Sequence, residues 1–280
     1  PGALSVIRRR DVLLGGAAML AACRRRAAVD LSGLAPTVRL GWRWVPGTSF
    51  TFQSVVTRTV ESVAIARGEA WTYTAFDLDP TGVVALRGAL VGFGATVTSH
   101  GEESTDPTLK AAREQARREA PSEVDLRLRL TGRVVSCSDE GFASGLPHRL
   151  LGVRLPPDPV APGASWDDPA FALAFARLLP VELPTRVVTR TTFRAFEEAE
   201  GGWQAHLEHQ GTISTTDGGP VLRLAGSTVW DTDPGAIASR RVEVRLDPDE
   251  PFHGVKLGTL RAELNRDRRG ERRIEAPLPS

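Results

Sequence analysis

The stretch Phe50-Thr51-Phe52-Gln53-Ser54-Val55-Val56-Thr57 decides the fold. Its large apolar residues and its polar residues largely alternate, and neighbouring side chains of a β-strand point to opposite faces of a sheet. The pattern therefore predicts a strand with one buried face. Similar patterns recur farther along the chain, at 71–76, 83–86, 90–97, 124–130 and from Arg186 to about Leu264. The sequence thus predicts a mainly β protein with antiparallel strands.

Two halves of this β-rich body share residues at fixed spacing. Val55-Val56-Thr57-Arg58-Thr59 recurs as Val187-Val188-Thr189-Arg190-Thr191, and a tryptophan follows each copy, at Trp71 and Trp203. We interpret the match as a duplicated meander with halves at about 40–100 and 160–246. Two such meanders could bury their apolar faces in one curved sheet, a half-barrel, or in a two-layer sandwich.

Two helices are expected between the strands. Ser104 to Pro107 supplies capping residues and an early proline, so a polar helix is predicted at about 107–120, within a helical connection at 104–121. Asp167-Asp168-Pro169 begins a second helix, at about 169–179. That helix is apolar nearly all round, with Phe171, Leu173 and Phe175, and it should lie buried against a sheet.

The composition is that of an ordinary globular chain. It has 280 residues, of which 41% are hydrophobic and 25% charged, with a net charge of +1. Such a charge gives no reason to expect nucleic-acid binding. We expect no cofactor, since Gly92-Phe93-Gly94 lacks the third glycine of a dinucleotide loop.

The N-terminal residues have the parts of an export signal. Three arginines, Arg8 to Arg10, precede a short apolar run that ends at Cys23. Leu20-Ala21-Ala22-Cys23 resembles the lipobox of bacterial lipoproteins, and Arg9-Arg10-Asp11-Val12-Leu13 resembles a twin-arginine signal. The resemblance implies that residues 1–22 are a signal peptide and that Cys23 is acylated and inserted into membrane lipid. The alternative is an N-terminal helix with an incidental cysteine.

The domain layout follows from this interpretation. Residues 23–37 become a lipid-anchored tether, 38–264 the β body, and 265–280 a disordered tail. By analogy with the enterobacterial sorting rule, Arg24 after the cysteine favours the outer membrane, facing the periplasm. Acylation of Cys23 leaves Cys137 as a lone thiol and a small buried residue, and a disulfide between the two is the competing interpretation.

Few residues form a pattern that suggests chemistry. His206 and His209 are the closest histidine pair, but residues three apart on a strand face opposite sides and could not easily share a metal. Asp77-Leu78-Asp79-Pro80 and Asp231-Thr232-Asp233-Pro234 are typical of turns. The six tryptophans could line a cleft, but we expect most of them in the core: Trp42, Trp44, Trp71, Trp166, Trp203 and Trp230.

Three functions fit these patterns. The favoured one is a non-enzymatic envelope lipoprotein that binds a lipid or another apolar ligand, with Phe171, Leu173 and Phe175 closing a cavity. A curved sheet covered by an apolar helix loosely resembles Lol-type lipoprotein carriers, and the chain as a whole resembles lipoproteins of unknown function. The second is a protein-binding module of the envelope that uses a sheet edge or the polar helix. The third is a hydrolase with scattered residues, among them His206, His209, Asp231 and Asp233.

Overall fold

The structure is a computed structural model that describes residues 37–100, 102–103, 106–107, 111, 114–115, 117–118, 120–176, 185–199, 202–215, 221–247 and 258–268. These residues belong to one compact unit, Thr37–Ser280. Its strands are β1 (Ser49–Val60), β2 (Val63–Leu78), β3 (Val83–Ser99), β4 (Glu102–Glu103), β5 (Glu123–Arg129), β6 (Val134–Cys137), β7 (Ser165–Trp166), β8 (Thr185–Ala199), β9 (Gly202–Thr215), β10 (Val221–Asp231), β11 (Ala236–Asp247) and β12 (Thr259–Asp267). Its described helices are α3 (Phe142–Arg149) and α4 (Pro169–Ala176).

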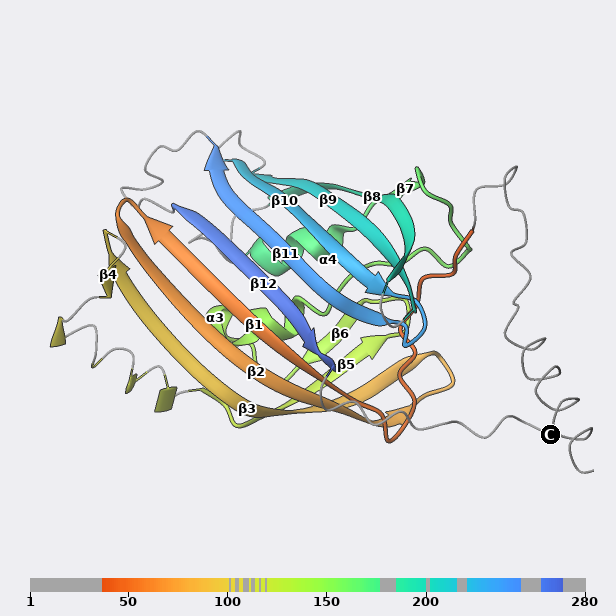
Figure 1. Cartoon of the computed structure of the whole chain (residues 1–280), viewed down its shortest axis with the longest axis horizontal. Coiled ribbons are helices and arrows are strands. Elements are labelled where there is room, and N and C mark those ends of the chain that lie inside the picture. The colour runs from red at the N-terminus through yellow and green to blue at the C-terminus, as the bar shows by residue number, and fades with distance from the viewer. Residues whose placement is uncertain are drawn as a thin grey trace, which may run out of the picture. The chain divides into compact units, whose positions relative to one another are not determined.

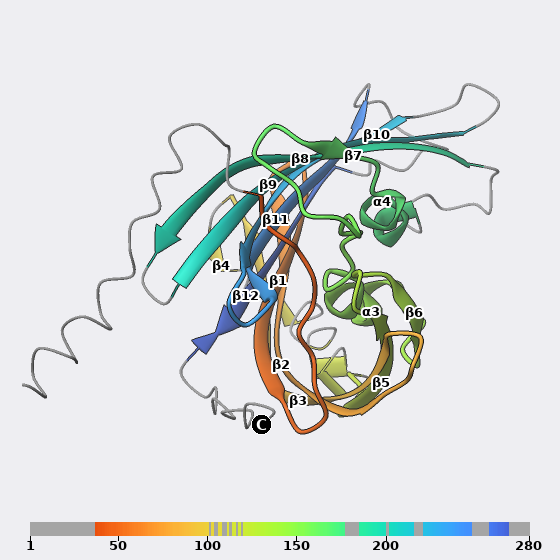
Figure 2. The ribbon, with the colours of Figure 1, turned by 90° about the vertical axis from the view of Figure 1, so that its right-hand side faces the viewer.

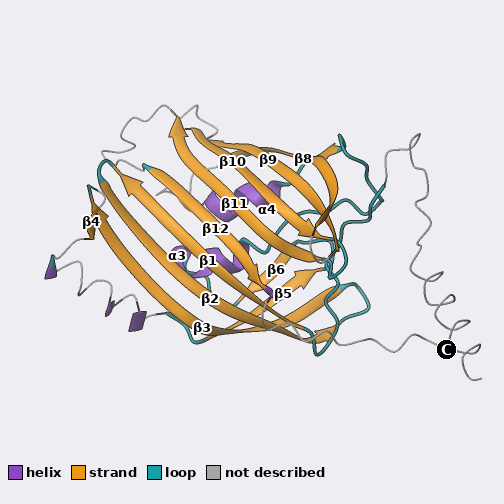
Figure 3. Ribbon diagram, viewed as in Figure 1, coloured by secondary structure: helices purple, strands orange, loops and turns teal. Residues whose placement is uncertain are grey.

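The strands form a single curved antiparallel sheet. Its order is β6-β5-β3-β2-β1-β12-β11-β10-β9-β8-β7, and β4 pairs with β3 (Figures 1 and 3). The curvature brings α3 and α4 to the inner face (Figure 2). The mainly β prediction is therefore confirmed, and the sheet is an unclosed half-barrel rather than a two-layer sandwich.

The alternation predicted from the sequence sets which side chains face inward. Phe50 and Phe52 of β1 are buried, whereas Gln53 and Val55 are exposed. The β5 segment repeats the pattern, with Val124, Leu126 and Leu128 buried between exposed charged residues. A shift of one residue would turn each buried set to solvent, so these patterns fix the register.

The sequence matches between the two halves do not mark equivalent positions. Val56 points to the inner face of β1, whereas its counterpart Val188 points outward on β8 and is 53% exposed. Trp71 lies opposite Phe52 in the middle of β2, but Trp203 lies at the start of β9. Counted from the matching Val-Val-Thr-Arg-Thr copies, the β8–β9 hairpin turns farther along the chain than the β1–β2 hairpin. Residues after the turn therefore do not occupy equivalent positions in the two halves. The sheet contains two neighbouring meanders, but these residues do not relate them as a repeat.

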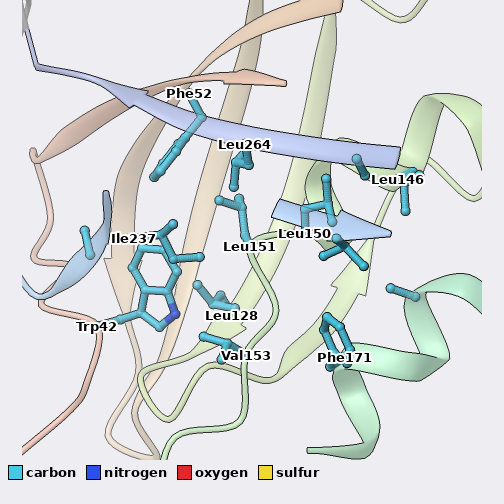
Figure 4. Packing of buried hydrophobic residues seen from close by; sticks show 14 of the residues in the cluster. Trp42, Phe52, Leu128, Leu146, Leu150, Leu151, Val153, Phe171, Ile237 and Leu264 are labelled. Atoms are coloured by element: carbon cyan, nitrogen blue, oxygen red, sulfur yellow. The ribbon is translucent and has the colours of Figure 1, made fainter. Parts of the chain in front are cut away.

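The sequence did not predict helix α3, because residues 141–165 are rich in Gly and Pro and show no helical pattern. Gly145 and Pro147 lie inside α3, and such residues disfavour a helix. Burial overrides that preference, because Leu146, Leu150, Leu151 and Val153 all insert into the core. Figure 4 shows these residues facing Leu128 and Leu264 of the sheet. No strand forms at 150–153; the segment crosses the inner face as an irregular chain.

The remaining predicted segments are described in part. Helix α4 begins at Pro169 as expected, where Asp168 Oδ1 accepts the N–H of Phe171 at 3.2 Å; residues 177–179 lie outside the described residues. In the range 107–120, the described positions 107, 111, 114–115 and 117–118 are helical. Strand β12 continues to Asp267, three residues beyond the expected end of the body, and 269–280 lie outside the described residues.

One buried cation holds the inner segments to the sheet. Arg240 of β11 is 3% exposed, and its Nη1 donates to the carbonyl oxygens of Leu150 and Gly152, both at 2.6 Å. Its guanidinium also lies 5.2 Å from the ring centre of Phe171 on α4. Arg240 therefore joins the irregular segment, α4 and the sheet at one point.

We expect Arg240→Met to lower the free energy of unfolding by about 2–4 kcal/mol, because two buried carbonyls lose their donor. Urea denaturation followed by tryptophan fluorescence measures the change. Arg241→Met is the matched control: Arg241 is an exposed neighbour that pairs with Glu263 at 2.9 Å, and its loss should change stability by less than about 1 kcal/mol. Equal effects of the two substitutions would contradict the role given to Arg240.

Candidate functional site

A pocket lies along β6, at one edge of the sheet. It has a volume of about 470 Å³ and is lined by Arg133, Val134, Val135, Ser136, Cys137, Asp139, Glu140, Arg149, Gly152 and Ala174. Five consecutive residues of the edge strand and its approach form one wall. Side chains and backbone from α3, the irregular segment and α4 form the rest. The pocket thus combines charged groups of both signs with a free thiol.

Cys137 is the thiol in this pocket, and its environment keeps it protonated. Burial raises the pKa of the Cys137 thiol, although the backbone N–H of Asp139 donates to its sulfur and opposes this effect. A cysteine nucleophile reacts as the thiolate and is usually activated by a lowered pKa. The surroundings of Cys137 have the opposite effect, so this arrangement favours a binding or structural role over nucleophilic chemistry.

A row of polar groups lies behind the pocket on the inner face. The hydroxyl of Tyr73 and Nδ1 of His148 are 2.6 Å apart, and the ring of Trp71 lies edge-on to His148 at 4.6 Å. The indole N–H of Trp71 donates to Glu69 at 2.7 Å, and Glu69 also pairs with Arg67. These contacts attach α3 to β2 through hydrogen bonds as well as apolar packing.

His148 is the central group of this row and is neutral at ordinary pH. Burial is the main cause that lowers its pKa to about 4, and Arg149 and Arg67 act in the same direction. The hydroxyl of Tyr73 keeps its proton, because burial raises its pKa well above the usual value. We therefore assign Tyr73 as the donor to Nδ1, which leaves the proton of His148 on Nε2.

The Nε2 of His148 faces a carboxylate that it does not reach. Nε2 lies 4.0 Å from Oδ2 of Asp139, and neither atom has a hydrogen-bond partner among the described residues. Asp139 instead uses Oδ1, which accepts from the N–H of Gly141 and the hydroxyl of Ser144 at 2.9 and 2.8 Å. Asp139 thereby supports the first turn of α3 and also forms part of the pocket wall.

The second polar group lies under α4. Phe171 stacks on His209 of β9 with ring centres 4.8 Å apart, and His209 is held by the hydroxyls of Thr191 and Thr228 at 2.9 and 2.8 Å. Burial lowers the pKa of His209 well below its usual value, and Arg240 adds to the effect. His209 therefore serves as a neutral stacking surface for α4.

The proposed ligand-closing residues lie on this helix. Phe171 and Phe175 are buried, with their ring centres 6.2 Å apart. Leu173 is on α4, but its side chain lies outside the described part of the structure. Neither phenylalanine lines the pocket beside β6, a pocket across β8–β11 or a pocket over β1–β3.

The four candidate hydrolase residues do not meet in one site. His206 faces away from His209, as expected for a strand, and its Nε2 lies 2.7 Å from Glu197. Asp231 is buried and pairs with Arg266 and Arg268. Asp233 is exposed. The polar groups that do converge are Tyr73, His148 and Asp139. No pattern in the sequence pointed to them, because Tyr73 lies 75 residues before His148.

Asp79 and most of the tryptophans behave as the sequence indicated. Asp79 Oδ1 accepts the N–H groups of Thr81 and Val83, at 2.9 and 3.0 Å, so this aspartate forms a turn. Trp42, Trp44, Trp71 and Trp230 are core residues, whereas Trp203 is 41% exposed and stacks on Phe196. Among the described residues, no group of three or more acidic, histidine or cysteine side chains could hold a metal ion.

Comparisons with known proteins give no family. No family model matches the chain, and no curated protein matches it. One solved structure that matches is a "putative exported protein with YmcC-like fold" from Bacteroides fragilis, with 11% identity and a TM-score of 0.30, over 82% of this chain and 100% of that one. Another is DynF from the dynemicin biosynthesis pathway of Micromonospora chersina, with 10% identity and a TM-score of 0.19, over 83% and 86% of the two chains. At these values neither likeness bears on function.

The lipid-attachment prediction stays a prediction. Cys23 and residues 1–36 lie outside the described residues. In the part of the chain that the structure describes, no helix combines the length and the apolar character that a membrane crossing requires.

The buried His148 should make folding stability depend on pH. Its folded pKa of about 4 lies below the ordinary 6.5. The contribution of neutral His148 to the free energy of unfolding is therefore complete above about pH 6.5. It is lost as the pH falls towards 4, by up to about 3 kcal/mol. The free energy of unfolding is measured by urea denaturation at a series of pH values. As the pH is lowered, it should fall less steeply in His148→Gln than in the wild type, and His206→Gln should follow the wild type. An unchanged slope in His148→Gln would refute the assignment.

Proposed function

We propose that this chain is a non-enzymatic lipoprotein of the bacterial envelope, held at a membrane by acylated Cys23, and that its curved sheet is a binding module. The observation that carries the proposal is the order of parts in the sequence: an arginine cluster, a short apolar run, a cysteine, a basic tether and then the β body. The outer membrane, facing the periplasm, is the favoured location. Three arginines directly after Cys23 would lie near the lipid head groups.

The environment of the reactive groups supports a binding role. The thiol of Cys137 has a raised pKa, and the pKa values of His148 and His209 are lowered by burial. Ion pairs with Arg266 and Arg268 occupy the buried carboxylate of Asp231, one of the two acidic candidates. These groups are fixed in contacts that hold the fold together, and a general acid, base or nucleophile needs access to a substrate.

The ligand that we favour is apolar, such as an acyl chain, under α4. This helix presents buried Phe171 and Phe175 to the inner face of the sheet. An acyl chain would replace contacts between α4 and the strands, so α4 would act as the cover. Protein binding in the envelope is the second candidate, favoured by the pocket along the edge strand β6.

For the anchor, Cys23→Ala should move the protein from the membrane fraction to the soluble fraction of cells and should remove labelling by radioactive palmitate. Loss of a single diacyl group accounts for both effects, since acyl chains contribute about 0.8 kcal/mol per buried methylene group. Cys137→Ala is the matched control and should stay at the membrane and be labelled. Membrane retention of unlabelled Cys23→Ala would contradict the lipid anchor.

For the ligand, purified Cys23→Ala protein should bind a fluorescent sixteen-carbon fatty acid saturably, and unlabelled palmitate should displace it. Phe175→Ser should weaken binding at least tenfold, equivalent to about 1.4 kcal/mol. Val188→Ser, on the exposed outer face, should leave the affinity unchanged. Circular dichroism checks that both variants are folded. Absence of saturable binding by the folded parent protein would rule out the acyl ligand without affecting the anchor.

A further inference from the structure

Strand β6 is the outermost strand on its side of the sheet and pairs only with β5 among the described strands. An edge strand presents unpaired N–H and C=O groups that can accept a further strand. The pocket of about 470 Å³ runs along this edge and is lined by every residue from Arg133 to Cys137. The position of the pocket therefore coincides with the free backbone of β6.

The hydrogen bonds to β5 show which residues of β6 face the pocket. The N–H of Ser138 donates to Asp125 at 2.9 Å, and the N–H of Arg129 donates to the carbonyl of Arg133 at 2.8 Å. In an antiparallel ladder, the residues next to such pairs turn their backbone groups to the other side. The backbone groups of Val134 and Cys137 accordingly face away from β5, towards the pocket.

The chain itself already covers the neighbouring part of this edge. The N–H of Val153 donates to Gly132 at 3.0 Å, and the N–H of Leu155 donates to Thr131 at 2.9 Å. The covering segment turns away at Gly152, where Arg240 holds the carbonyl oxygen. Backbone pairing along this edge therefore stops just before β6, and a second strand could continue it.

The side chains at the opening indicate which kind of segment would fit. Arg133 is exposed. It is the one charged residue of the pocket wall that has no partner among the described residues, since Asp139 accepts from Ser144, Arg149 donates to the carbonyl of Gly141, and Glu140 also has a partner. Val135 is 48% exposed and adds an apolar surface. We propose that the groove beside β6 binds an extended, acidic segment of a partner protein, which adds to β6 as a further strand. The acidic side chain pairs with Arg133, and the backbone pairs with Val134 and Cys137.

This proposal is independent of the lipid anchor and of an acyl ligand. Its test uses the full chain carrying Cys23→Ala, so that Cys137 is the sole remaining thiol. The probe is the acetylated peptide Thr-Val-Asp-Val-Thr-Val with an amidated C-terminus. Binding is followed by fluorescence anisotropy of a labelled copy and by the rate at which N-ethylmaleimide modifies Cys137. The peptide should bind saturably and should slow the modification of Cys137 at least fivefold.

Matched peptides and variants separate strand addition from other contacts. Two peptides with alternate backbone nitrogens methylated, one in each register, should differ. The peptide whose free N–H groups face β6 should bind, and the peptide with that edge methylated should not, because it cannot pair with β6. Arg133→Glu should weaken the acidic peptide about fivefold and favour its lysine analogue. Arg241→Glu, at an exposed residue of β11 that does not line the groove, should change neither. Equal binding of the two methylated peptides, unchanged modification of Cys137, or the same affinities in Arg133→Glu would each overturn the proposal.

Discussion

The buried guanidinium of Arg240 is the interaction on which the inner side of this sheet depends. Burial of a charge is unfavourable unless nearby groups offset the loss of solvent, and here Nη1 donates to two backbone carbonyls while the guanidinium lies over an aromatic ring. Asp168, the capping residue of α4, lies near enough to raise the pKa of Arg240, although burial lowers it overall to about 10. A single side chain thus fixes the irregular segment and α4 at the same place on the sheet.

That attachment also places the chain that covers the inner face of the open half-barrel. The inner face near β5 and β11 is covered by Leu146, Leu151 and Val153 rather than by further strands. Because Gly152 is held by Arg240, the covering chain cannot also run along β6. The same contact that seals the core therefore leaves one edge of the sheet exposed, and the pocket forms there.

The two buried histidines of the interior, His148 and His209, have similar surroundings. His148 and His209 each combine a hydrogen bond to a hydroxyl with an aromatic contact, and burial keeps each ring neutral. Neutral imidazoles accept hydrogen bonds without the desolvation that a charge would suffer. They anchor α3 and α4 to the sheet, which is a structural use of residues that in another setting would suggest catalysis.

The sequence alone determined that the protein is mainly β, which faces of its strands are buried, where α4 begins and that Asp79 forms a turn, since these features depend on side chains adjacent in the chain. It could not show α3, because Gly145 and Pro147 argue locally against a helix and only burial makes one. The equal spacing from each Val-Val-Thr-Arg-Thr copy to its tryptophan also misled, because the β8–β9 hairpin turns later than the β1–β2 hairpin and places Trp203 at the start of β9. Only the tertiary structure brought Tyr73, His148 and Asp139 together, since the packing of α3 against β2 joins positions that no local pattern connects.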